Sequence, residues 1–127
     1  MTREAPAEKL ARYAAGLAAA RKAQDIVVLD LRRLSSVTDF FVLCSGRSRV
    51  QVQAVCENIL AGMGRHEQRP LSVEGLDWGH WALLDFGEVV VHVFQQESRS
   101  TYDLERLWRQ APRTEYEAGD QRVGDTG

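Results

Sequence analysis

The side chains of this sequence that could take part in chemistry gather in one stretch, HWALLDFGEVVVHVF. It holds the carboxylates of Asp85 and Glu88, the imidazole of His92, and the aromatic rings of Trp81 and Phe94. Paired carboxylates can act as a general acid and base, and an imidazole can carry a proton near neutral pH. The same side chains could instead bind another protein, with aromatic residues as anchors and polar ones at the rim. Two alternatives follow, a catalytic cleft and a contact surface.

We expect this stretch to form two β-strands joined by a two-residue turn at Phe86-Gly87. The expected cross-strand pairs are Asp85 with Glu88, Leu83 with Val90, and Trp81 with His92. Because side chains alternate along a strand, one face is wholly aliphatic and suits a layer of helices. The other face is mixed and holds Trp81, Leu83, Asp85, Glu88, Val90, His92 and Phe94. The pattern leaves open whether the N-terminal helix or the C-terminal segment covers Trp81 and Phe94.

Catalytic signatures are poorly represented elsewhere in the chain. The three histidines lack the spacing of metal ligands, and Glu74 is the only carboxylate on the strand expected after the turn Ser45-Gly46-Arg47-Ser48. Nucleotidyltransferases place Gly-Ser in a similar turn and a carboxylate pair on the next strand, whereas the order here is Ser-Gly. We therefore expect that the protein is not an enzyme and that it binds no metal and no cofactor. The alternative is a nucleotide-binding, nucleotidyltransferase-like enzyme that uses the Ser45 to Ser48 turn as a phosphate cradle.

The elements that must position these residues are an amphipathic helix over 6–22, strands over 25–31 and 39–46, and a helix that begins at the cap Ser48 and ends near Gly62 or Gly64. A short strand over 71–75 precedes the hairpin. A last helix, capped by Ser98 or Ser100, carries the apolar side chains Leu104, Leu107 and Trp108 and ends before Pro112. This order predicts an α/β fold, with a single mixed sheet of about five strands and helices mainly on one face.

Composition places further bounds on function. With 127 residues the chain fits one domain, expected over 1–111, and its polar end, 112–127, is expected to be disordered. A net charge of −2 disfavours binding to nucleic acid through counterion release. Cys44 and Cys56 are expected to be reduced core residues. No apolar run suits a membrane span, and Glu4 and Glu8 argue against a transit peptide, so we expect a cytoplasmic protein.

Several motifs together resemble the ribosomal silencing factor, or Iojap-like, family over roughly residues 8 to 110. In order, they are DFFV, SGRS, VEG, HWALLDFG, VVVHVF and TYDLERLW. The resemblance implies a nucleotidyltransferase-like fold without the catalytic metal site. It also implies binding to the large ribosomal subunit through its ribosomal protein fourteen, which would sterically block association with the small subunit and repress translation when nutrients are limiting. Family members are often homodimers when free.

The resemblance also implies a partner-binding surface on the hairpin and the segment after it. The implied residues are Trp81, Leu84, Asp85, His92 and Phe94, with Arg99, Tyr102 and Glu105 from the following segment. The alternation of side chains agrees for all the hairpin members except Leu84, which it assigns to the aliphatic face. Phe86 and Glu88 stand where the family commonly has Tyr and Asp.

Overall fold

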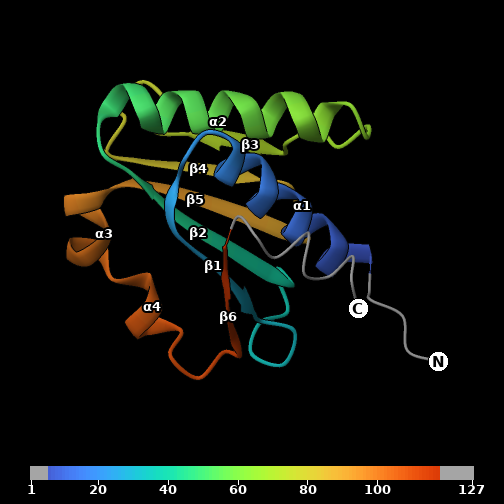
Figure 1. Cartoon of the computed structure of the whole chain (residues 1–127). Coiled ribbons are helices and arrows are strands. Elements are labelled where there is room, and N and C mark those ends of the chain that lie inside the picture. Colours follow the sequence, from blue (N-terminus) through green and yellow to red (C-terminus); the bar gives the residue numbers. More distant parts are fainter. Residues whose placement is uncertain (1–5, 118–127) are drawn as a thin grey trace.

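The structure, a computed structural model, describes residues 6–117 (Figure 1). Its elements are α1 (Pro6–Ala20), β1 (Gln24–Asp30), β2 (Phe40–Gly46), α2 (Arg49–Gly64), β3 (Ser72–Glu74), β4 (Trp81–Asp85), β5 (Val89–Gln95), α3 (Gln96–Tyr102), α4 (Leu104–Leu107) and β6 (Arg113–Tyr116). The elements predicted before residue 96 are all present, with ends within about two residues of those predicted. Among the described residues no helix is long and apolar enough to cross a membrane.

The strands form a single mixed sheet in the order β3-β4-β5-β2-β1-β6. Strands β2 and β5 are parallel neighbours, whereas the other neighbouring pairs are antiparallel. The predicted fold class is therefore confirmed, with six strands in place of about five.

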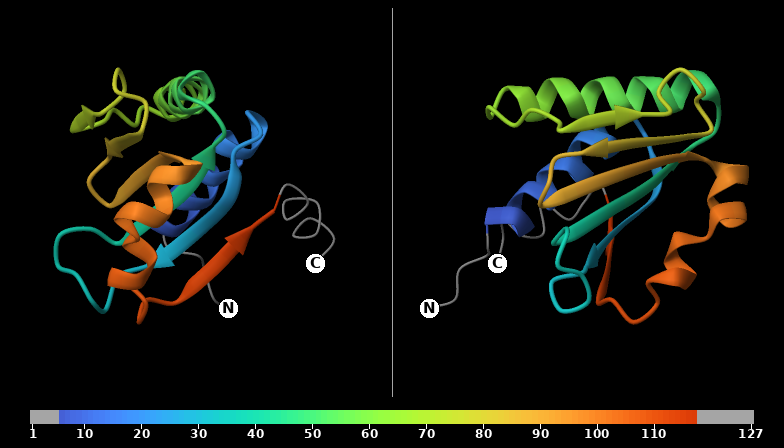
Figure 2. Two further views of the ribbon diagram at one scale, coloured as in Figure 1. Left: turned by 90° about the vertical axis from the view of Figure 1, so that its left-hand side faces the viewer. Right: turned by 180° about the vertical axis from the view of Figure 1, so that it is seen from behind.

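Helices α1 and α2 cover the aliphatic face of the sheet. Side chains such as Leu84, Val91 and Val93 are completely buried beneath them. The two helices can lie close together because α1 is rich in alanine and Gly62 of α2 has no side chain. A Cβ added at Gly62 would come within 2.5 Å of Leu17 on α1. Helices α3 and α4 lie on the other side of the sheet (Figure 2).

Helix α2 begins as the sequence predicts. The backbone of Ser48 is extended, and its Oγ accepts a hydrogen bond from the Gln51 N–H at 3.1 Å. The Gln51 side chain accepts from the Arg47 N–H at 2.7 Å, whereas a standard capping box would use the N–H of the cap residue. The helix start is thus fixed by local hydrogen bonds that the sequence encodes.

The C-terminal part of the chain differs from the prediction. Ser98 and Ser100 do not cap a helix, because the chain passes directly from β5 into α3 and both residues lie inside it. Asp103, with φ 49°, interrupts the helical path before α4. Leu104 and Trp108 pack against the second face of the sheet as an apolar stripe would, but Leu107 is 72% exposed.

Residues 113–116, expected to be disordered, form the edge strand β6. It pairs with β1, whose outer edge would otherwise leave backbone groups without partners, and the Asp30 N–H donates to the Pro112 carbonyl at 2.9 Å. Backbone pairing of this kind needs no large aliphatic side chains, so composition did not reveal it. The rest of the expected tail, 118–127, lies outside the described residues.

Candidate functional site

The hairpin turn lies one residue later than predicted. The Phe86 N–H donates to the Val89 carbonyl at 2.9 Å, so Gly87 and Glu88 occupy the turn, and Gly87 adopts φ 88°, which favours glycine. The observed pairs include Trp81 with Phe94, Leu83 with His92, and Asp85 with Val90. The predicted turn at Phe86-Gly87 is wrong because the Phe86 side chain is apolar and is buried under the helices. Moving the turn by one residue moves each cross-strand partner by two residues. Because side chains alternate along a strand, every strand side chain keeps its predicted face.

The two candidate acid/base residues have structural surroundings. Asp85 Oδ1 accepts a hydrogen bond from the Gly87 N–H at 2.8 Å and so stabilises the turn. Glu88 is exposed in that turn, and its carbonyl accepts from the N–H groups of Asp39 and Phe40. The pair therefore belongs to the turn and does not line a cleft.

Six rings on the mixed face form what we call the aromatic seam. It runs from Trp108 after α4 across the sheet to Tyr102 at the end of α3, and its members are Trp108, Phe41, His92, Phe94, Trp81 and Tyr102. Successive rings are in contact, with centroid distances of 5.9 Å for Phe41–Trp108, 4.5 Å for Phe41–His92, 6.2 Å for His92–Phe94, 5.2 Å for Trp81–Phe94 and 4.5 Å for Trp81–Tyr102. The C-terminal segment thus covers much of this face, which was one of the alternatives left open by the sequence.

His92 holds the indole of Trp81 in place. Its Nδ1 accepts a hydrogen bond from Trp81 Nε1 at 3.1 Å. Burial lowers the pKa of His92 to about 4, so the ring is neutral at pH 7. Because Nδ1 is the acceptor, the proton lies on Nε2, which is buried and has no hydrogen-bond partner among the described residues. Within the seam, neutral His92 therefore orients Trp81 through this hydrogen bond.

The predicted contact residues of the hairpin lie at different depths. Leu84 and Phe94 are 0% exposed and His92 is 4% exposed, so these three side chains do not reach the surface of the chain. Leu84 packs under the helices, as the alternation of side chains predicts. Trp81 and Asp85 are half-buried. The expected five-residue surface is thus reduced to these two, supported from beneath by His92 and Phe94.

The three predicted residues beyond the hairpin are held near the sheet. Arg99 donates from Nε to Glu105 Oε1 and from Nη1 to Ser45 Oγ, both at 3.0 Å, and Glu105 also pairs with Arg113 of β6. Burial alone would raise the pKa of Glu105, but hydrogen bonds from the two arginines outweigh it and lower that pKa. Tyr102 is 42% exposed beside Trp81. Arg99 and Glu105 therefore brace α3 and α4. Tyr102, together with Trp81, forms the exposed edge of the seam, which we call its rim.

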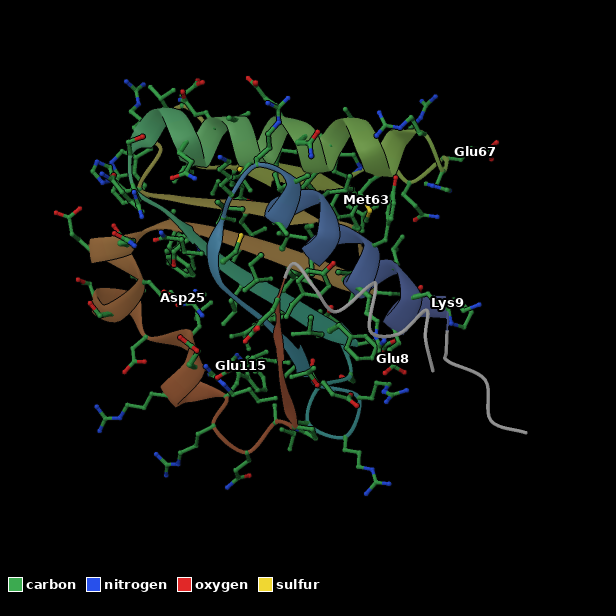
Figure 3. The ribbon with its side chains drawn as sticks, viewed as in Figure 1. Glu8, Lys9, Asp25, Met63, Glu67 and Glu115 are labelled. Atoms are coloured by element: carbon green, nitrogen blue, oxygen red, sulfur yellow. The ribbon has the colours of Figure 1, made fainter. Side chains whose placement is uncertain are left out.

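A polar cleft surrounds this ion-pair network. Asp25, Arg99 and Glu115 are among the residues that line it. Figure 3 labels Asp25 and Glu115. Arg99 also donates to the backbone carbonyl of Asp25. The cations that line the cleft are already paired, so the cleft offers no free guanidinium to an anionic ligand.

The Ser45 to Ser48 turn has few groups left to bind a phosphate. The Arg47 N–H is taken by Gln51, the Ser45 hydroxyl accepts from Arg99, and Ser48 caps α2. Within residues 6–117 no group of three or more His, Cys, Asp or Glu side chains could hold a metal ion. The internal hydrogen bonds of the turn give the phosphate-cradle alternative no support.

Both cysteines are free and buried, as predicted. Burial raises the pKa of Cys44 and of Cys56 to about 12. Neither thiol is therefore ionised at pH 7, and nucleophilic or redox chemistry at these positions is disfavoured.

Sequence reasoning did not predict that several apolar residues outside the seam are exposed. Trp78, 54% exposed, lies in the turn before β4 and packs against His80 with ring centroids 4.9 Å apart. Leu107 of α4 and Leu71 before β3 are more than 70% exposed, at 72% and 75%. The signal for Trp78 was an aromatic residue beside Gly79 in a predicted turn, since turns run over the surface of a protein.

The fold and site define an α/β domain whose second sheet face carries a packed aromatic seam with an exposed rim. Its described residues contain no candidate metal centre. The family model described as ribosomal silencing factor during starvation matches residues 4–126. The chain therefore belongs to the ribosomal silencing factor family, as its motifs indicate.

Similar proteins agree with this assignment. The Bacillus subtilis protein named ribosomal silencing factor is 38% identical over 112 residues, which are 88% of this chain and 95% of that protein. Maize chloroplastic protein Iojap is 35% identical over 101 residues, 80% of this chain and 44% of that protein. A crystal structure from Chromobacterium violaceum superimposes with a TM-score of 0.80 at 30% identity, covering 82% of this chain and 87% of that one.

Proposed function

We propose that this chain binds the large ribosomal subunit through its ribosomal protein fourteen and blocks association with the small subunit. Translation would thereby be repressed in the cytoplasm when nutrients are limiting, as in stationary phase. The observation that carries the proposal is family membership over nearly the whole chain. A mouse relative named mitochondrial assembly of ribosomal large subunit protein 1 is 36% identical over 90 residues, 68% of this chain and 39% of that protein, and its name supports the same partner.

The exposed rim of the aromatic seam is the surface that we propose for this contact. Trp81 and Tyr102 would supply the aromatic anchors, and Asp85 would lie at the polar edge. Arg99 and Glu105 would keep α3 and α4 in place beside them. Leu84, His92 and Phe94 would act from beneath, by fixing the position of the rim. The proposed mechanism is steric and needs no catalytic group.

Co-sedimentation with purified large subunits tests this function. The wild-type chain should sediment with the subunit, whereas Trp81→Ala and Tyr102→Ala should bind with a loss of at least about 2 kcal/mol, roughly thirtyfold in Kd. Val37→Ala is a matched control, because Val37 is 86% exposed in the loop between β1 and β2. Lack of sedimentation by the wild type would refute the function; wild-type affinity in both aromatic variants would refute the surface alone.

Subunit joining provides a second test. Light scattering from mixed small and large subunits should rise more slowly, and to a lower plateau, when the large subunits are first incubated with the chain. We further propose that the free chain forms a homodimer, which a dilution series in static light scattering would detect as a fall in mass. A mass that stays monomeric at every concentration would remove the dimer and leave the ribosomal function standing.

A further inference from the structure

A groove of about 790 Å³ lies between α4 and the loop that follows β1. The side chains that matter for its chemistry are Leu34, Tyr102, Arg106, Leu107, Trp108 and Arg109. It lies on the side of α4 that does not pack on the sheet, because Leu104 and Trp108 fill the contact with the second face. The groove adjoins the polar cleft around Arg99, because Ser100 and Asp103 line both, but Arg99, Glu105 and Arg113 do not line the groove.

Exposed apolar side chains line this groove. Leu107 is 72% exposed, Leu34 is 41% exposed and Tyr102 is 42% exposed. Helix α4 buries no residue completely, so Leu107 adds little to the stability of the domain. Apolar side chains that cluster on a surface commonly mark a site of interaction, whereas single ones do not. The cluster therefore indicates a surface that another molecule covers.

The charge of the groove defines the kind of partner. Arg106 and Arg109 both line it, and neither forms an ion pair with any residue of the range 6–117. Asp103 is the one carboxylate among the lining residues. Two unpaired guanidinium groups beside exposed leucines fit a segment that carries both carboxylates and apolar side chains, since guanidinium groups bind carboxylates in bidentate geometry.

A nucleic acid fits the same groove less well. Stacking of bases requires free aromatic faces. The Tyr102 ring, however, packs on Trp81 with ring centroids 4.5 Å apart, and the Trp108 ring contacts Phe41 with ring centroids 5.9 Å apart. The most exposed apolar side chain that lines the groove is the aliphatic Leu107. The observations therefore favour a peptide.

We propose that this groove binds a short acidic peptide segment of another protein, with apolar side chains seated on Leu34 and Leu107 and carboxylates on Arg106 and Arg109. The proposal goes beyond the ribosomal function above and does not depend on it: Tyr102 borders both surfaces, but Leu107, Arg106 and Arg109 belong to the groove alone. A site of this size gives a small interface, and such interfaces are usually weak and transient.

Fluorescence anisotropy with the full chain tests the proposal. The probe is a labelled amphipathic peptide with leucines at helical spacing and glutamates elsewhere, and the matched probe replaces every glutamate by lysine. We expect the acidic peptide to bind, and added salt to weaken that binding. Leu107→Ser, and the double variant Arg106→Glu with Arg109→Glu, should each lose at least about tenfold in affinity.

Val50→Ser is the control variant, because Val50 is 74% exposed on α2 and does not line the groove. Circular dichroism should show that all variants keep the wild-type melting temperature. The proposal is overturned if the acidic peptide does not bind, if the lysine peptide binds equally well, or if Leu107→Ser leaves affinity unchanged. Leu107-dependent binding of a single-stranded RNA oligonucleotide in place of the peptide would assign the groove to nucleic acid. Concentration-dependent dimerisation that Leu107→Ser abolishes would assign it to a second copy of the chain.

Discussion

Replacement of His92 by asparagine should remove a specific pH dependence of stability. His92 is buried, and desolvation lowers its pKa from 6.5 to about 4 in the folded chain. In the unfolded chain the imidazole returns to its ordinary pKa and binds a proton below about 6.5. Between these two values the unfolded state holds more protons, so the free energy of unfolding falls as the pH is lowered. Asparagine does not titrate, and its side-chain oxygen can still accept from the Trp81 indole.

The expected magnitude follows from the two pKa values. Relative to pH 7, the contribution of His92 to the free energy of unfolding should be lower by roughly 2 kcal/mol at pH 5 and by about 3 kcal/mol once the pH is below 4. No charged group contributes to the lowering of this pKa, so added salt should have little effect on the size of the change.

Urea unfolding of the wild type and of His92→Asn, followed by circular dichroism from pH 7.5 to 4.5, measures this effect. Carboxylates titrate in both proteins, so the informative quantity is the difference between the two free energies of unfolding at each pH. That difference should shrink on acidification, because only the wild type loses the contribution of a buried neutral histidine. Parallel pH profiles would show that His92 is not buried in its neutral form and would refute the reasoning.

Three further predictions concern the supports of the site. Gly75→Ala should lower stability by more than about 2 kcal/mol in a thermal melt, because Gly75 has φ 77° and an added Cβ would lie 2.1 Å from the Trp81 carbonyl oxygen; an unchanged melt would contradict this. Glu105→Gln should cost about 1–2 kcal/mol and speed hydrogen exchange in β6, since one side chain pairs with arginines of α3 and β6; unaltered exchange would argue against it. Cys44 and Cys56 should react with a thiol reagent only after denaturant is added, and rapid reaction of the native chain would disprove their burial.

Much of the fold could be predicted because its signals are local. The helical spacing and the Ser48 cap predicted α2, and β-branched runs predicted β1 and β2. Strict alternation sorted the hairpin into two faces, and the faces remain correct although the pairing moved by two residues. A shift of that size does not change which side of the sheet a side chain occupies.

The contact surface could be predicted only in part. Motif resemblance and alternation together identified Trp81 and its neighbours, but neither reports how deeply a side chain lies beneath other elements. Phe94 is buried because Trp81 and the segment that follows β5 lie over the mixed face of the sheet. Tyr102 and Leu107 are exposed because α3 and α4 are short and turn at Asp103. Exposure of this kind depends on contacts between distant parts of the chain.

By itself, the sequence determined the family, the α/β class, the helices and strands before residue 96, and the face on which each hairpin side chain lies. Those properties depend on residue type and spacing over a few neighbours. Only the tertiary structure decided that Gly87 and Glu88 form the turn, that β6 completes the sheet, and that His92 orients Trp81 from a buried position. The physical reason is that turn position, edge pairing and burial are set by which segments pack together, and those contacts join residues far apart in the chain.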